Sequence, residues 1–197
     1  ADDLNKSGAT ALALEANLTN CASVHAMAAK AIEHFGAIYG AFNHVEACTM
    51  QGLDEITEDV WDYILRQNLK ATLLVNQAIL PHMLSAGSGI IVNSASDLSI
   101  DAVAGYAAYC AAKAAIYSMT KAMAVEFTSK GIRINAIGIG PVLAGNSELR
   151  AEMSLNASMR RLGRLEEIAS VVEFLMDDRS SYVAGQIIQA NGGAVMW

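Results

Sequence analysis

The sequence lacks the features that mark nucleic-acid-binding and membrane proteins. It contains no block of lysine and arginine, and its formal net charge is −7, which argues against nucleic acid or an anionic membrane as the main partner. Charged residues such as Lys113, Glu126 and Glu173 interrupt the apolar stretches, so none is long enough to cross a bilayer. Aromatic residues make up only 6% of the chain, so the core must be built from aliphatic residues and methionine.

Cysteine is too scarce and too scattered for a disulfide framework. The three cysteines, Cys21, Cys48 and Cys110, are odd in number and far apart, which suits a reducing compartment. No CxxC pair is present, so we expect no zinc site. The first three residues, ADD, do not resemble a signal peptide. These features favour a cytoplasmic location.

The chain does contain an alternation of two patterns. It is 53% hydrophobic and 17% charged, which is typical of globular proteins, and its 197 residues fit one domain over residues 1–197. Short apolar runs bounded by glycine predict buried parallel strands. The predicted strands are Thr10–Leu14, Ile38–Phe42, Gly89–Asn93, Ile132–Ile137 and Gln186–Gln189.

Helical patterns lie between these runs. Hydrophobic residues recur at a spacing of about 3.6 residues, which predicts amphipathic helices. Thr57 is a suitable N-cap for the second helix, and Gly131 ends the third. The predicted helices are Val24–Phe35, Val60–Met83, Tyr106–Ser129 and Glu166–Met176. Repeated strand–helix–strand units predict an α/β fold of three layers, with helices on both faces of a mainly parallel sheet.

The stretch YAAYCAAKAA, residues 106–115, places a tyrosine and a lysine four residues apart. On a helix, Tyr109 and Lys113 share a face. A protonated lysine favours phenolate, so we expect Lys113 to lower the pKa of Tyr109 toward neutrality. Such a tyrosine can give a proton to a carbonyl oxygen, or take one from an alcohol, near pH 7. The alternative is a buried helix that carries an incidental lysine.

Other residues point to the same end of the predicted sheet. Ser96 follows the strand Gly89–Asn93, at the carboxyl end where open α/β sheets bind their ligands. Asn68 lies in the middle of a helix, where an amide is a poor helix former and needs a partner if it is buried. Taken singly, Ser96 fits a capping residue and Asn68 fits a solvated amide.

These pieces together resemble the short-chain dehydrogenase/reductase family, in the shorter group that includes the 3-oxoacyl carrier-protein reductases. From residue 16 onward the matching pieces are ANLTN, GAFN, RQNLKATLLVNQAILPHM, IIVNSAS, YCAAK, GIRINAIGIGPV, RLGRLEEIASVVEFL and SYVAGQIIQANGG. The resemblance implies a Rossmann-like fold and hydride transfer between NAD or NADP and a small-molecule carbonyl or secondary alcohol. It also implies a homodimer or homotetramer formed through the helices Val60–Met83 and Tyr106–Ser129.

The resemblance further implies a catalytic tetrad of Asn68, Ser96, Tyr109 and Lys113. Tyr109 would be the general acid/base, and Lys113 would lower its pKa and bind the nicotinamide ribose. Ser96 would hold the substrate oxygen, and Asn68 would position a water that links Lys113 to solvent. The implied cofactor-binding residues are Asn17, Leu18, Asn43, His44, Tyr109, Lys113, Pro141 and Val142.

The chain departs from the family pattern where the cofactor pyrophosphate binds. The family's glycine-rich turn, TGxxxGxG, does not occur, so we expect the N-terminal strand–helix–strand unit of roughly 40 residues to be missing. The lost strands would lie between Thr10–Leu14 and Ile38–Phe42, which leaves Thr10–Leu14 without a neighbour. The family's NNAG reads Asn43-His44-Val45-Glu46, and Glu46 adds negative charge near a dianionic pyrophosphate. A common threonine is replaced by Ala144.

Three interpretations are open at this point. In the first, the native protein carries the missing unit and is a working dehydrogenase, which the intact tetrad favours. In the second, the chain is a non-catalytic, cofactor-poor relative that binds a partner or ligand, which the sequence His44-Val45-Glu46 favours. In the third, it is a structural subunit. The residues do not decide between NAD and NADP or fix the direction of reaction, and the segment Leu143–Leu162, which largely sets the substrate, points to no single one.

Overall fold

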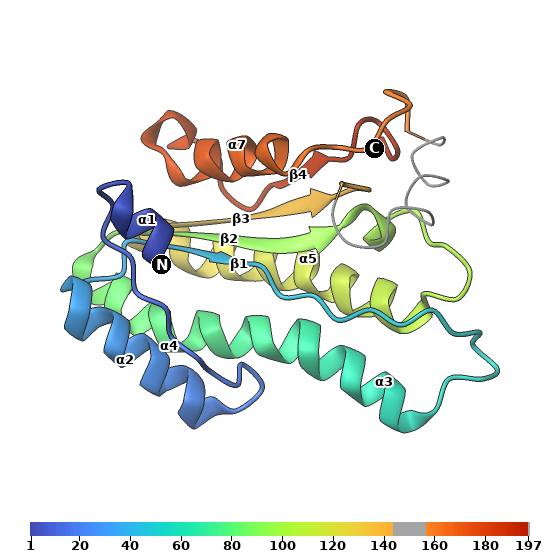
Figure 1. The fold of residues 1–197 in the computed structure, drawn as a ribbon, viewed down its shortest axis with the longest axis horizontal. Helices are drawn as coiled ribbons and strands as arrows, with labels where there is room; N and C mark the ends of the chain where they lie inside the picture. Colours follow the sequence, from blue (N-terminus) through green and yellow to red (C-terminus); the bar gives the residue numbers. More distant parts are fainter. Residues whose placement is uncertain (144–156, 197) are drawn as a thin grey trace.

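A four-stranded parallel sheet lies between two layers of helices in the computed structural model, which describes residues 1–143 and 157–196 (Figure 1). The strands follow one another across the sheet in the order β1-β2-β3-β4. They are β1 Gly40–Asn43, β2 Gly89–Ser96, β3 Ile132–Ile139 and β4 Ile187–Ala190. The predicted three-layer, Rossmann-like α/β fold is therefore confirmed.

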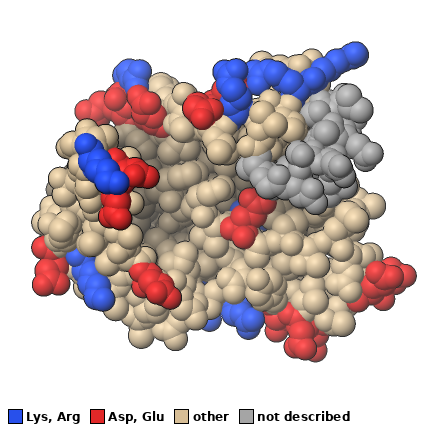
Figure 2. All heavy atoms as spheres, viewed as in Figure 1, with Lys and Arg blue, Asp and Glu red and all other residues tan. Residues whose placement is uncertain are grey.

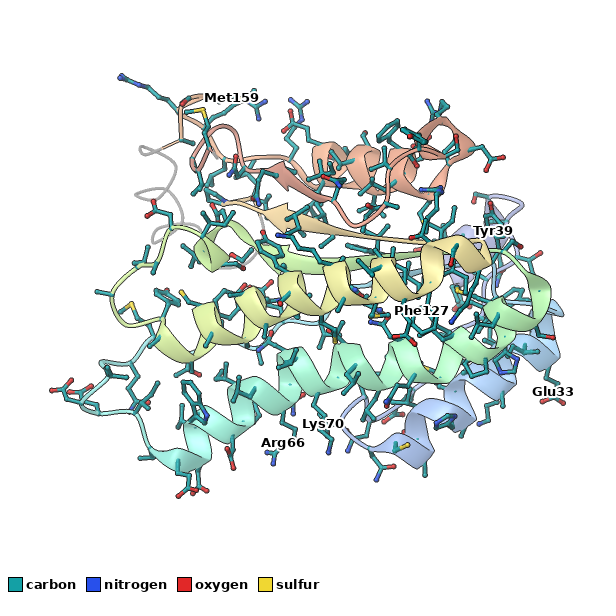
Figure 3. The ribbon with its side chains drawn as sticks, turned by 180° about the vertical axis from the view of Figure 1, so that it is seen from behind. Glu33, Tyr39, Arg66, Lys70, Phe127 and Met159 are labelled. Atoms are coloured by element: carbon teal, nitrogen blue, oxygen red, sulfur yellow. The ribbon has the colours of Figure 1, made fainter. Side chains whose placement is uncertain are left out.

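The two faces of the sheet are covered unequally. Helices α2 to α5 lie on one face, and α7 covers the other (Figures 1 and 3). The α-helices are α1 Asp2–Lys6, α2 Cys21–Phe35, α3 Glu58–Leu65, α4 Ala71–Ala86, α5 Ala107–Phe127 and α7 Leu165–Met176, and the shorter turns are η1 Arg66–Lys70, η2 Asp97–Ser99, η3 Thr128–Lys130 and η4 Asp178–Ser180. Within the described residues, no helix is both long and apolar enough to cross a membrane.

The core follows from the alternation of side chains along the strands. Ile91 of β2 and Ile134 of β3 pack against α2, α4 and α5. Their neighbours in sequence face the other way: Ile90 and Val92 pack with Leu175 of α7. All eight residues of β2 are buried, as expected for a central parallel strand covered on both sides. This burial fixes the register of β2 and hence the position of Ser96 at its end.

A hydrogen-bonded group of buried amides ties the sheet to the helices beneath it. The Asn43 side-chain amide of β1 donates to the side-chain oxygens of Asn76 on α4, at 2.6 Å, and Asn93 on β2, at 2.9 Å. The Asn93 amide in turn donates to the Thr120 hydroxyl on α5 at 3.0 Å. All four side chains are buried, so losing any one leaves a polar group unsatisfied. The group anchors the carboxyl end of β1.

The long predicted helix Val60–Met83 is present, with one irregular turn. Its N-cap is Thr57, whose hydroxyl accepts the Val60 N–H at 3.3 Å. The chain then runs through α3, the π-helical turn η1 and α4 without a break. A π turn holds one residue more than an α-helical turn and often marks a functional position. Asn68 lies inside it.

The predicted strand Thr10–Leu14 is wrong. These residues form neither helix nor strand, and β1 is the edge strand of the sheet in the described part of the chain. The physical reason is the pairing requirement: a β-strand is stabilised by a neighbour that satisfies its backbone N–H and C=O groups. The other predicted strands and helices occur within a few residues of the expected bounds.

Gly131 makes the tight connection between α5 and β3. Its φ is +84°, and its N–H donates to the Thr128 carbonyl at 3.1 Å. A Cβ at this position would collide with the carbonyl oxygen of Gly87, which follows α4. Glycine is therefore needed here both for its conformation and for the close approach of two backbones.

We expect Gly131→Ala to destabilise the protein more than Gly36→Ala. Both glycines have a positive φ, +84° and +82°, but a Cβ on Gly36 meets no atom within 4 Å. The conformational cost is therefore shared, and the clash with Gly87 adds about 1–3 kcal/mol at Gly131 alone. Urea denaturation of the two variants measures the difference, and equal losses of unfolding free energy would contradict the role of the close approach.

Candidate active site

The predicted tetrad residues gather where β2 ends beside the first turns of α5. Tyr109 and Lys113 lie on one face of α5 and are buried, with 6% and 1% of their surfaces exposed. Ser96 is the last residue of β2. This is the carboxyl end of the parallel strands, where α/β sheets of this kind place ligands.

The ammonium group of Lys113 is bonded to the ends of two strands. It donates to the carbonyl of Val45, just past β1, at 2.8 Å, and more weakly to the carbonyl of Ser94 on β2, at 3.5 Å. It also lies over the Tyr109 ring, 5.6 Å from the ring centroid. Burial lowers the pKa of Lys113 to about 8, with the negative charge of Glu46 opposing this change. Lys113 can therefore exchange a proton near neutral pH.

The pKa of Tyr109 shifts in the direction opposite to the one expected from the sequence. Burial raises it above its ordinary value, and the negative charge of Glu46 raises it further, while a hydrogen bond with Ser96 lowers it. The Tyr109 hydroxyl points toward Glu46, with a long contact of 3.5 Å to Oε1. The expectation failed because it considered Lys113 alone. The raised pKa favours the neutral, proton-donating form of Tyr109.

Ser96 has two roles in the structure. Its hydroxyl accepts the Leu98 N–H at 3.2 Å, so it caps the short turn η2, as a capping residue would. It also donates to the Asp97 carboxylate at 3.2 Å and interacts with Tyr109. The backbone carbonyl of Ser96 accepts the Tyr117 hydroxyl at 2.9 Å. Ser96 is thus fixed at both its main chain and its side chain.

Asp97 was not singled out from the sequence. It is buried, and burial raises its pKa, although hydrogen bonds from Ser96 and the Leu98 N–H oppose the shift. Its position directly after Ser96 in NSASD was the available signal. A carboxylate after Ser96 orients the hydroxyl that faces Tyr109.

Asn68 is completely buried and its amide is fully bonded to the protein. Its side-chain oxygen accepts the Ala47 N–H at 3.2 Å, and its NH₂ donates to the carbonyls of Ala47, at 2.8 Å, and Ile64, at 2.9 Å. These bonds join the π turn to the segment that follows β1. They explain why an amide is tolerated in mid-helix. The predicted role of Asn68 in positioning a water stays a prediction.

The structure places two of the other predicted cofactor residues beside this site. Asn43 belongs to the buried amide group at the end of β1. The His44 ring lies 3.1 Å, through Nδ1, from the Ser94 hydroxyl and stacks on Phe42 with ring centroids 5.4 Å apart. Both are therefore held next to the segment that binds Lys113.

The remaining predicted cofactor residues make their contacts elsewhere. Asn17 accepts from Thr19 just before α2, and Leu18 packs against the hydrophobic core that includes residues of α2 and α4. Pro141 and Val142 follow β3, where Val142 forms a bridge with Gly163. No hydrogen bond links Asn17 or Leu18 to the tetrad in the described part of the chain.

Two further expectations fall largely outside what is described. Ala144, and most of the segment Leu143–Leu162 that was expected to set the substrate, lie in residues 144–156, which the structure does not describe. Among residues 1–143 and 157–196, no group of His, Cys, Asp and Glu is placed to hold a metal ion. Figure 2 shows acidic and basic side chains scattered over the visible face, not gathered in a basic patch.

Comparisons with known proteins agree on one family. A family model described as enoyl-(acyl carrier protein) reductase matches residues 1–195. A 3-oxoacyl-(acyl-carrier-protein) reductase FabG from Staphylococcus aureus is 30% identical over 200 residues, covering 99% of this chain and 81% of the relative. A 2-(S)-hydroxypropyl-CoM dehydrogenase 3 from Xanthobacter autotrophicus is 31% identical over 201 residues, covering 96% and 79%.

A solved structure of a protein from the same family has a similar fold. The crystal structure described as that of a short-chain dehydrogenase/reductase from Burkholderia xenovorans matches with a TM-score of 0.91 and 28% identity. The match covers 97% of this chain and 77% of that one.

The lowered pKa of Lys113 predicts a specific dependence of stability on pH. In the folded protein the Lys113 ammonium group has a pKa of about 8. In the unfolded chain its pKa is the ordinary value of about 10.4. Between these values the unfolded chain binds more protons, so the free energy of unfolding rises with pH. Relative to Lys113→Met, the wild type should gain about 2 kcal/mol between about pH 7 and 10. Urea denaturation across this range tests it; parallel pH profiles for the two proteins would show that Lys113 is not perturbed.

Proposed function

Because this chain belongs to the short-chain dehydrogenase/reductase family of NAD(P)-dependent oxidoreductases, we propose that Tyr109 is the general acid/base of its hydride transfer between NAD(P)(H) and a carbonyl or secondary alcohol. The observation that carries the proposal is the burial of Tyr109 and Lys113 on one face of α5, beside Ser96 at the end of β2. A buried acid with a neighbouring cation is the arrangement that proton transfer requires.

The donor groups at this end of the site fit the ribose end of a nicotinamide nucleotide. Lys113 offers an ammonium group and Tyr109 a hydroxyl, both from the same helix face, and these are suitable partners for sugar hydroxyls. The segment after β1 fits less well, because Glu46 brings a negative charge next to Tyr109. We therefore assign the ribose to the side of Lys113.

The protein's part in the reaction is proton transfer and positioning. A nicotinamide cofactor, when bound, would supply the hydride for the carbonyl carbon. The neutral Tyr109 hydroxyl then gives its proton to the carbonyl oxygen, which completes the alcohol. Lys113, with a pKa of about 8, lies over the Tyr109 ring and can itself exchange a proton near neutral pH. In the reverse direction Tyr109 must first be deprotonated, and its phenolate then accepts the alcohol proton.

Ser96 and Asn68 act on the geometry of this transfer. The Ser96 hydroxyl, which interacts with Tyr109, can donate to the same substrate oxygen if its proton rotates from Asp97 toward that oxygen, with the side chain held in place. Asn68 holds the backbone of Ala47, and so keeps the segment after β1 against Lys113. The non-catalytic alternative is not favoured, because the relatives are named as a reductase and a dehydrogenase.

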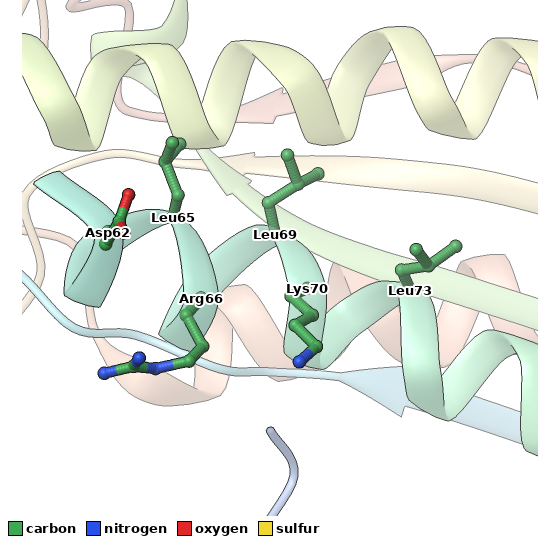
Figure 4. Close-up of a pocket in the computed structure, with 6 residues that line it drawn as sticks. All are labelled: Asp62, Leu65, Arg66, Leu69, Lys70 and Leu73. Atoms are coloured by element: carbon green, nitrogen blue, oxygen red, sulfur yellow. The ribbon is translucent and has the colours of Figure 1, made fainter. Parts of the chain in front are cut away.

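We also propose that the chain forms a homodimer or homotetramer through the helical face α3–η1–α4. A hollow of about 360 Å³ on this face is lined by Leu65, Leu69 and Leu73 (Figure 4). Its other lining residues are Asp62, Arg66 and Lys70. A face with apolar residues and both signs of charge can pair with its own copy across a two-fold axis.

The cytoplasmic location stays a prediction. The three cysteines form no disulfide.

Replacing Tyr109 tests the catalytic proposal. Tyr109→Phe keeps the ring but removes the proton donor, so turnover should fall by about 10²–10⁴-fold. Tyr63→Phe, which alters an exposed tyrosine on α3, is the matched control and should retain activity. Steady-state rates with NAD(P)H and a panel of small ketones provide the measurement. Near-normal turnover of a folded Tyr109→Phe protein would remove Tyr109 from the mechanism.

Sedimentation tests the assembly. We expect a dimer or larger species at micromolar concentration, and we expect Leu73→Glu to shift it toward monomer by placing a charge on the apolar face. Leu73 is 38% exposed, so the monomer should tolerate the change. Leu53→Glu, at a residue that is 73% exposed in the loop between β1 and α3, is the control. A wild-type protein that sediments as a compact monomer would contradict the proposal.

A further inference from the structure

Three consecutive residues after β1 each bind a different member of the tetrad. The Val45 carbonyl accepts from Lys113 at 2.8 Å. The Glu46 carboxylate faces the Tyr109 hydroxyl at 3.5 Å. The Ala47 backbone is bonded at both N–H and C=O to the Asn68 side chain. We call Val45–Ala47 the connecting segment. Its backbone is anchored on both sides of Glu46, so the carboxylate is aimed at Tyr109 by fixed neighbours.

We propose that Glu46 is a positioning residue that holds Tyr109 in its neutral, proton-donating form, so that the site reduces carbonyls at neutral pH and oxidises alcohols only at alkaline pH. This inference rests on the proposed function of Tyr109. Glu46 takes no proton itself and makes no bond to substrate. It acts through the charge that it places beside the Tyr109 hydroxyl.

The chemistry of the contact favours one state of Tyr109. A carboxylate has only acceptor oxygens, so it is stabilised by a neutral phenol, which has an O–H to donate. It is destabilised by a phenolate, because two negative charges would then lie a few ångströms apart. The contact of 3.5 Å is long for a hydrogen bond, so the charge contributes more than the bond.

Lys113 does not cancel this effect in the structure. Its ammonium group donates to the carbonyls of Val45 and Ser94 and faces the Tyr109 ring 5.6 Å away. The Lys113 charge therefore lies beside the Tyr109 ring, whereas the Glu46 carboxylate lies next to the hydroxyl itself. Glu46, by contrast, is exposed and points its carboxylate at the hydroxyl itself.

The other groups around Tyr109 support the same direction. Burial is the largest influence on the Tyr109 pKa and raises it, and Glu46 is the next. Ser96, at the end of β2, is the neighbour whose hydrogen bond lowers it. The titratable and charged groups that face Tyr109 are Glu46 and Cys48 from the segment after β1, Asp97 from η2, Lys113 from α5 and Tyr106 at the start of α5.

The first test reads the ionisation of Tyr109 directly and needs no cofactor. Protein labelled with carbon-13 at tyrosine Cζ gives one resonance for each tyrosine, and Tyr109→Phe identifies the one of interest. Titration from about pH 6 to 11 should leave Tyr109 neutral in the wild type up to the alkaline end of the range, where it should begin to ionise. In Glu46→Gln, which keeps the shape and removes the charge, it should begin to ionise about 1–2 pH units lower. Glu55→Gln, which alters an exposed carboxylate farther along the loop between β1 and α3, should behave as the wild type.

The second test reads the consequence for catalysis. In Glu46→Gln the pH at which alcohol oxidation reaches half its maximum should fall by about 1–2 pH units. Reduction by the variant should start to decline at a correspondingly lower pH. Glu55→Gln should keep the wild-type profile. A wild-type protein without oxidoreductase activity would reject the proposed function. The titration of Tyr109 would still test the role of Glu46 in that case.

Two outcomes overturn the inference. If Tyr109 stays neutral across the range in both the wild type and Glu46→Gln, burial alone holds it and Glu46 is not needed. If Tyr109 of the wild type ionises near pH 7, the carboxylate does not hold it at all. A shift confined to Glu46→Gln, in both the titration and the rate profile, supports the assignment.

Discussion

A buried ammonium group is the constraint on which the site depends. Removing a charged lysine from water costs several kcal/mol unless polar groups replace the solvent. Lys113 is 1% exposed, and the replacement comes from the carbonyls of Val45 and Ser94. These carbonyls lie just past β1 and within β2, so Lys113 is satisfied only when the two strands end side by side. The amide group around Asn43 fixes that alignment from beneath.

The same arrangement explains how the site can hold several titratable groups in a small volume. Lys113 is buried with its pKa lowered, and Asp97 and Tyr109 have theirs raised. Each shift moves its group toward the neutral form, because burial penalises charge whatever its sign. Glu46, which faces Tyr109, is by contrast exposed to solvent. This exposed carboxylate raises the pKa of both Tyr109 and Lys113, although burial is the larger influence on each.

The sequence predicted the fold well where its signals were local. Strand β2 and helix α5 follow from apolar runs and helical periodicity, and the gathering of Ser96 with Tyr109 and Lys113 follows from strand ends and i, i+4 spacing. The strand Thr10–Leu14 was wrong because a strand depends on a partner, which no local pattern supplies. The raised pKa of Tyr109 was missed because it depends on burial and on Glu46, 63 residues away in the chain.

The π turn at Asn68 sets the rotation between two parts of one helix. Each residue of an α-helix turns the chain by about 100°, so one additional residue in a turn changes the direction in which every later side chain points. Ahead of the turn, Ile64 faces the core, and beyond it Ala71 and Val75 do so. Inside it, Asn68 faces Ala47 while Leu69 lines the outer hollow. A deletion of one residue within Arg66–Lys70 would restore a regular helix. The side chains after the deletion would then be rotated relative to those before it, so that Ile64 and Val75 could no longer both face the core. The number of residues in this turn therefore decides which side chains of α4 face the core.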